Sequence, residues 1–222
     1  MSTINVAGYS GVIGSLQVNG NISQVRAGGA FNINAGAAPT NQGSGAFSVG
    51  NSAGLLNQGT NAFAIGTSAG RNDQGANALA IGSGAGQTTQ ASQSIAIGNS
   101  AGNSSQQINS IAIGQQAGET TLGSSAVAIG VQAGQTTCGA NAVAIGFFAG
   151  TTNCGANSVC IGRRAGNLNC PANTIVLNSS GADLNPAAAG VFISSIRGVS
   201  GTGRAAGTLF YDSVTSEVCY AT

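Results

Sequence analysis

The chain has 222 residues, of which 5% are charged and 37 are glycine, and its formal net charge is +1. It contains no histidine, which excludes Ser-His-Asp and Cys-His catalysis and imidazole metal ligands. Its six basic residues form no cluster of the kind that binds nucleic acid. No apolar run approaches the roughly 18 residues of a membrane span, and Met1 to Val6 lack the features of a secretory signal. We therefore expect no nucleic-acid partner, no membrane insertion and no export by the general route.

The first segment, residues 1–44, breaks the period that governs the rest of the chain. Within residues 16–22, Asn19-Gly20 lies between two alternating segments, which is the strongest short-range signal for a β-hairpin. We interpret residues 1–44 as an N-terminal cap or as an arm that docks onto another protein.

Residues 45–178 follow a strict period of sixteen positions. Ile-Gly or Val-Gly dipeptides end, without a slip, at Gly50, Gly66, Gly82, Gly98, Gly114, Gly130, Gly146 and Gly162. A strict short period indicates stacked turns that cannot bury their apolar faces alone. The glycine content excludes helix, where each glycine costs about 1 kcal/mol, and the spacing excludes collagen. The sequence therefore predicts an all-β solenoid with one coil per unit.

The first strand of each coil has two faces, because alternate side chains point to opposite sides. Large apolar pairs such as Phe63 and Ile65 are predicted to fill the coil interior. The other face holds small residues and never a charge or an aromatic ring. We therefore expect this face to contact another chain in a closed oligomer. Its expected interface residues are Ala64, Ala80, Ala96, Ala112, Ala128, Ala144 and Cys160.

The segment after the first strand contains Gly-x-x-Ala-Gly, which supplies the positive φ angles of a chain reversal. In the second strand the charged residues Arg71, Asp73 and Glu119 mark the outward face. The predicted inward residues are Leu56, Thr88, Thr120, Thr136, Thr152 and Leu168, followed by Gln90, Leu122 and Cys138.

The units Asn109 to Gly114 and Asn141 to Gly146 resemble the head repeats of trimeric autotransporter adhesins over about residues 45–178. The resemblance implies a left-handed parallel β-roll in an intertwined homotrimer. Similar repeats occur in fibre-like proteins of large DNA viruses and in phage tail proteins. Residues 179–222 are expected to form a linker, a strand from Val191 to Arg197 and a small C-terminal β module. Its segments, 208–212 and 217–220, are similar to a short hairpin that ends such viral proteins.

Three cysteines, Cys138, Cys154 and Cys170, lie one period apart, at the inward position that glutamine fills in earlier coils. We interpret them as a ladder of buried reduced thiols, with a disulfide or a metal site as the alternative. Cys160 replaces the small alanine of its coil and is predicted to be a slightly larger interface residue.

Two further functions remain open as alternatives. A tailspike-like glycan hydrolase needs two carboxylates some 5 to 9.5 Å apart, but Asp73 and Glu119 are three coils apart. An ice-binding solenoid would use Thr-Thr pairs such as Thr88 and Thr89, of which one residue is expected to face outward.

The pair after each Ile-Gly changes from small and polar to Phe147-Phe148 and then Arg163-Arg164. One interpretation is that these residues pack under the linker and the terminal module. The other is a contact patch that stacks on sugars and binds acidic groups of a glycan or receptor.

These observations predict a non-enzymatic structural fibre or spike on a virion surface, with host attachment as a further role. The expected partners are further copies of the chain, a capsid or other virion protein, and a cell-surface glycan or receptor. No cofactor and no metal are expected. The alternative is the head of a bacterial trimeric adhesin at the bacterial cell surface.

Overall fold

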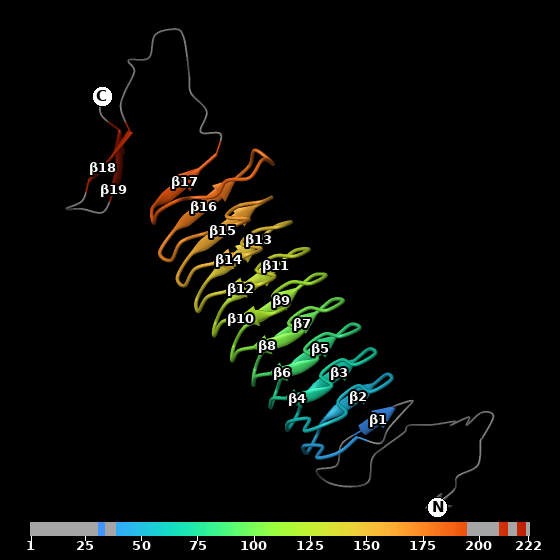
Figure 1. The fold of residues 1–222 in the computed structure, drawn as a ribbon. Coiled ribbons are helices and arrows are strands. Elements are labelled where there is room, and N and C mark those ends of the chain that lie inside the picture. The colour runs from blue at the N-terminus through green and yellow to red at the C-terminus, as the bar shows by residue number, and fades with distance from the viewer. Residues whose placement is uncertain (1–30, 34–38, 195–208, 213–216, 221–222) are drawn as a thin grey trace, which may run out of the picture.

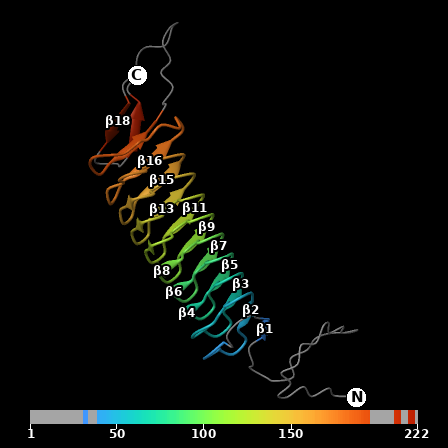
Figure 2. The same ribbon diagram turned by 45° about the vertical axis from the view of Figure 1, so that its right-hand side comes forward.

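The computed structural model describes residues 31–33, 39–194, 209–212 and 217–220. These residues form an all-β protein whose main body is a parallel solenoid of about 10 turns, each about 16 residues long. Figures 1 and 2 show the coils following one another along one axis. The predicted solenoid and its coil length are confirmed. A helix long and apolar enough to cross a membrane does not occur among the described residues.

Each regular coil contributes one strand to each of two sheets. The larger sheet consists, in order, of β1 (Phe31–Ile33), β2 (Phe47–Val49), β3 (Phe63–Ile65), β5 (Leu79–Ile81), β7 (Ile95–Ile97), β9 (Ile111–Ile113), β11 (Val127–Ile129), β13 (Val143–Ile145), β15 (Val159–Gly162), β16 (Ile175–Asn178) and β17 (Val191–Ile193). The smaller consists of β4 (Asn72–Gln74), β6 (Thr88–Gln90), β8 (Ser104–Gln106), β10 (Thr121–Leu122), β12 (Thr137–Cys138) and β14 (Asn153–Cys154).

Neighbouring strands pair residues that are one period apart, as in Ala112 with Ala128. The stack is longer than the glycine repeat indicates. At one end Phe31 pairs with Phe47, and at the other Ile175 pairs with Val191, so the same register continues on both sides of residues 45–178.

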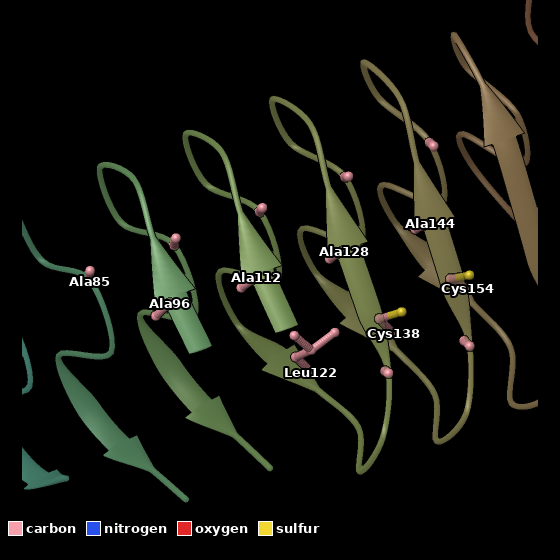
Figure 3. Close-up of a cluster of buried hydrophobic side chains, with 14 of the residues drawn as sticks. Ala85, Ala96, Ala112, Leu122, Ala128, Cys138, Ala144 and Cys154 are labelled. Atoms are coloured by element: carbon pink, nitrogen blue, oxygen red, sulfur yellow. The ribbon is translucent and has the colours of Figure 1, made fainter. Parts of the chain in front are cut away.

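The coil interior is narrow and is filled mainly by small side chains. In one coil the inward residues are Ala126, Ala128, Ala133 and Cys138, none more than 1% exposed. Figure 3 shows alanines on the larger sheet and Leu122, Cys138 and Cys154 on the smaller one. Three small residues and one larger residue therefore fill this coil.

This arrangement reverses the predicted faces of the first strand. Phe63 and Ile65 point outward and are half-buried, whereas Ala64 between them is completely buried within the single chain. The same correction applies to every residue expected at the interface between chains. These residues are 0% exposed inside their own coils: Ala64, Ala80, Ala96, Ala112, Ala128, Ala144 and Cys160.

The corner after each first strand has the predicted positive φ angles, for example 127° at Gly66 and 50° at Gly70. A β-carbon on Gly66 would lie 2.6 Å from the carbonyl oxygen of Gly82 in the next coil. Glycine at this position therefore permits both the turn and the close stacking of the coils.

The second sheet confirms part of the predicted inward set. Gln90, Leu122 and Cys138 are buried. Thr89, with a φ of 53°, interrupts the alternation, so Thr88 is exposed although it lies two residues before Gln90. Leu56 precedes another left-handed residue, Asn57, and is likewise exposed. The residues after Thr120, Thr136, Thr152 and Leu168 have no positive φ, yet these four are exposed too. The prediction is therefore corrected for Leu56, Thr88, Thr120, Thr136, Thr152 and Leu168.

Both flanks are partly described. The predicted hairpin in residues 16–22 lies outside the described residues. The expected linker after Asn178 forms most of the last coil, in which Leu184 bridges to Ala165. The strand expected from Val191 is present as β17. Further on, β18 (Leu209–Asp212) and β19 (Glu217–Tyr220) form an antiparallel pair.

Candidate functional site

The outward face of the larger sheet is an apolar ribbon. Both outward positions on each of its eleven strands hold a large apolar side chain, and none is fully buried. The ribbon consists of Phe31, Ile33, Phe47, Val49, Phe63, Ile65, Leu79, Ile81, Ile95, Ile97, Ile111, Ile113, Val127, Ile129, Val143, Ile145, Val159, Ile161, Ile175, Leu177, Val191 and Ile193. Because strands in a sheet are about 4.8 Å apart, it extends for about 48 Å.

Side chains of the ribbon stack on their equivalents in the neighbouring coils. The ring centroids of Phe31 and Phe47 are 5.3 Å apart, and those of Phe47 and Phe63 are 4.7 Å apart. Ile161 and Ile175 are each 40% exposed. Continuous apolar surfaces of this size are typical of interaction sites. Sequence reasoning missed the ribbon because it assigned these same residues to the interior.

The exposed residues on the strands of the smaller sheet are polar, although Leu56 and Leu168 are exposed in the coils beyond its two ends. Thr88 and Thr89 are both exposed, which corrects the prediction for this pair, whereas Thr151 is buried and Thr152 is exposed, as predicted. Asp73 accepts a hydrogen bond from Asn57 at 2.7 Å, and Glu119 accepts one from Gln135 at 2.7 Å. Three coils separate the two acids by about 14 Å, beyond the carboxylate spacing of a glycosidase.

The predicted aromatic and arginine residues lie together at the C-terminal end of the stack. The rings of Phe147 and Phe148 meet edge to face with centroids 4.2 Å apart. The guanidinium carbon of Arg163 lies 5.8 Å from the centroid of the Phe147 ring. We call Phe147, Phe148, Arg163 and Arg164 the aromatic-arginine patch.

Both arginines of this patch are engaged by the enlarged corner of the last coil. Arg163 donates a hydrogen bond to the carbonyl oxygen of Gly181 at 2.6 Å. Arg164 forms a salt bridge with Asp183, with 3.2 Å between nitrogen and oxygen. The structure thus places them against the segment after Asn178, as one of the two interpretations predicts. Sequence reasoning missed Gly181 and Asp183 because they lie outside the repeat.

The cysteines lie inside the last coils. Cys138 and Cys154 pair in register, and Cys154 bridges to Cys170, so the predicted ladder exists. Cys160 projects into the same interior from the larger sheet, and its Sγ is 3.9 Å from that of Cys154. The sulfur atoms of Cys154, Cys160 and Cys170, which we call the thiol cluster, all lie within 4.8 Å of one another.

The thiols perturb one another. Hydrogen bonds from Cys138, Cys160 and Cys170 lower the pKa of Cys154. Its hydrogen bond with Cys154, together with burial, raises the pKa of Cys170 to about 11. Deprotonation of the cluster therefore begins at Cys154, with the neighbouring thiols acting as donors.

No protein-family model matches this chain, and no curated protein or solved structure is significantly similar to it. The adhesin-like or virus-like family that the repeats resemble therefore stays a prediction.

Proposed function

We propose that this chain is a structural fibre protein without enzymatic activity, in which three copies bury their apolar ribbons against one another along a common axis. The ribbon carries this proposal. It is apolar at both outward positions of every strand of the larger sheet, whereas the exposed face of the smaller sheet is polar.

The stack itself supports a lengthwise association. Because the ribbon follows the same register from strand to strand, it presents the same width and chemistry in each coil. A contact made by one coil is therefore repeated by the next coil, and each added coil adds apolar area. Closed rotational symmetry is the usual way to cover such a face without forming open aggregates.

The number of chains and the handedness belong to the same proposal. Support for three chains and for a left-handed roll comes from the resemblance of Asn109 to Gly114 and Asn141 to Gly146 to trimeric adhesin heads. In this proposal the trimer interface is the apolar ribbon and not the face that carries Ala64 and its equivalents.

Light scattering on the full chain tests the assembly. The trimer should have three times the chain mass of 21.3 kDa, and electron micrographs should show rods. A monodisperse monomer at micromolar concentration would exclude the trimer.

We further propose that the fibre is displayed on a virion, attached to a capsid or other virion protein. The resemblance to viral and phage fibre repeats supports this location. Antibodies against the chain should label purified virus particles. Labelling of bacterial envelopes instead would favour the alternative, an adhesin head.

Host attachment, if the fibre performs it, is assigned to the aromatic-arginine patch. Three copies would present aromatic rings beside guanidinium groups, a combination that stacks on sugars and binds sulfate or carboxylate. A trimeric Arg163→Ser, Arg164→Ser double variant should lose binding to acidic glycans on an array. Unchanged glycan binding by this variant would exclude the patch while leaving the fibre proposal intact.

A further inference from the structure

The thiol cluster lies where the repeat departs from its own rule. At the position of Cys160 the six preceding coils from Ala64 to Ala144 carry alanine, with Ser48 and Asn32 before them and Val176 in the following coil. Opposite the alanines stand glutamine, leucine, Cys138 or Cys154. An alanine opposite a larger side chain is thus sufficient to fill a coil. The coil of Cys160 instead places a second thiol opposite Cys170, and both lie beside Cys154 of the preceding coil.

The three thiols converge from three separate segments. Cys154 is on β14 and Cys160 is on β15 of the larger sheet. Cys170 lies one coil after Cys154, with which it forms a β-bridge. All three are 0% exposed. Three thiolates around a metal ion with bonds of about 2.3 Å would lie about 4 Å apart in a trigonal site. The observed separations are 3.9 Å for one pair and at most 4.8 Å for the others, so only small shifts are needed to close the site.

The surroundings offer no good fourth ligand. The hydroxyl oxygen of Ser158 is 3.2 Å from Cys154 Sγ, but it donates a hydrogen bond to the carbonyl oxygen of Gly155 at 2.5 Å. Cys138 lies in the preceding coil and is not within 4.8 Å of all three cluster sulfurs. A buried site with three sulfur ligands does not complete the tetrahedron of structural zinc. It fits a soft ion that accepts three thiolates, of which Cu(I) is the biological example.

We propose that Cys154, Cys160 and Cys170 bind one soft monovalent metal ion of the Cu(I) class inside the coil. Each ligating thiol releases its proton to the solvent, so binding tightens as the pH rises. Because the cluster lies within one chain, this proposal does not depend on the trimer. On its C-terminal side the cluster is covered by the last coil, where Leu184 packs against the core.

The test is a titration of the reduced full-length protein with Cu(I) under anaerobic conditions, in competition with a chromogenic Cu(I) chelator. A Cys219→Ser background removes the cysteine that does not belong to the stacked coils. We expect one ion per chain, thiolate-to-metal charge-transfer absorption, and protection of the cluster thiols from alkylation. Zn²⁺ added at the same concentration should not displace Cu(I).

The repeat supplies matched variants. Cys160→Ala restores the residue of the other coils, so the coil should fold, and it should weaken Cu(I) binding by more than about 100-fold. Cys138→Leu copies Leu122 at the equivalent position and should leave the affinity unchanged. Circular dichroism verifies that both variants are folded.

Three results would overturn the proposal. The first is Cu(I) binding by Cys160→Ala equal to that of the parent. The second is tighter binding of Zn²⁺ than of Cu(I). The third is a Cys154–Cys160 disulfide, found by mass spectrometry after alkylation, in protein purified without reductant.

Discussion

Replacing Ile113 by lysine tests whether the apolar ribbon is an interface. Ile113 lies in the middle of the ribbon, half-buried, and pairs with Ile97 and Ile129 on the neighbouring strands. In an isolated chain the lysine stem would cover the same surface and its ammonium group would stay in water. The substitution would then cost less than about 1 kcal/mol of folding free energy.

In the proposed trimer the same substitution has a large effect. Ribbon residues such as Ile161 and Ile175 are 40% exposed in the single chain. Ile113 is less exposed than these residues, so it offers at most roughly 60 Å² of apolar surface, worth at most about 1.5 kcal/mol per chain when it is buried. Three ammonium groups would also meet at one level, and desolvation costs several kcal/mol for each ion. The sum over three chains is on the order of 10 kcal/mol, which is comparable with the whole free energy of a tight complex.

We therefore expect Ile113→Lys to prevent assembly. Size-exclusion chromatography with light scattering should give a folded or partly unfolded species near the chain mass of 21.3 kDa, or aggregates, instead of a species of three times that mass. Thr89→Lys is the matched control, because Thr89 is exposed on the smaller sheet, and it should assemble normally. An Ile113→Lys protein that assembles with the parent mass and thermal stability would refute the assignment of the ribbon.

Four other substitutions probe the coil itself. Gln74→Leu should lower the free energy of unfolding by about 1 to 3 kcal/mol, because the side-chain oxygen of buried Gln90 loses its donor at 3.1 Å. In the same denaturant titration Gln106→Leu should lower the free energy of unfolding by less, because the side-chain oxygen of Gln106 has no hydrogen-bond partner in the parent. Equal losses for the two variants would contradict a stabilising role for the hydrogen bond between Gln74 and Gln90. Gly114→Ala should lower the free energy of unfolding by at least about 1 to 3 kcal/mol, because the φ of Gly114 is 127°. The new β-carbon would also lie 2.5 Å from the carbonyl oxygen of Gly130 in the next coil. A thermal midpoint equal to that of the parent would refute this prediction. Arg164→Ser should cost less than about 1 kcal/mol, because its salt bridge with Asp183 is more than a third exposed, yet it should speed hydrogen exchange in residues 179–183, and unchanged exchange would show that the pair does not hold this corner.

The coil and its register could be predicted from the sequence because glycine reports backbone geometry directly. Gly66 and Gly70 have an equivalent in each neighbouring coil and adopt the positive φ angles that the turn needs. Close stacking at Gly66 excludes any side chain. Because every coil needs glycine at these two positions, the spacing of the glycines gives the period of the repeat. The period in turn determines which residues pair between neighbouring strands.

The direction of the faces could not be obtained from alternation alone. Alternation places Phe63 and Ile65 on one side and Ala64 on the other, but it does not tell which side is inside. The coil volume decides, since the interior already holds Ala69 and the long side chain of Gln74. On the second sheet, the left-handed backbone of Thr89 leaves Thr88 exposed, which alternation does not anticipate.

The candidate sites could likewise be predicted only where they depend on the period of the repeat. Phe147 and Arg163 are one period apart, so their proximity follows from the register, whereas the contact of Arg164 with Asp183 depends on a corner outside the repeat. The cysteine ladder also follows from the period. The approach of Cys160 to Cys154 does not, because it requires the inward direction of the alanine position.

The interior and the ribbon are under different physical constraints. The inward position on the larger sheet is small throughout the central coils, as at Ala80, Ala112 and Ala144, where the side chains are completely buried and a larger group would have to displace its neighbours. The ribbon varies in size from Phe47 to Val143, yet it remains apolar on every strand. Folding of a single coil does not demand apolar side chains at half-exposed positions, where polar residues would cost little. Burial against another ribbon along the whole stack would require an apolar side chain at every one of these positions. It would tolerate differences in side-chain shape.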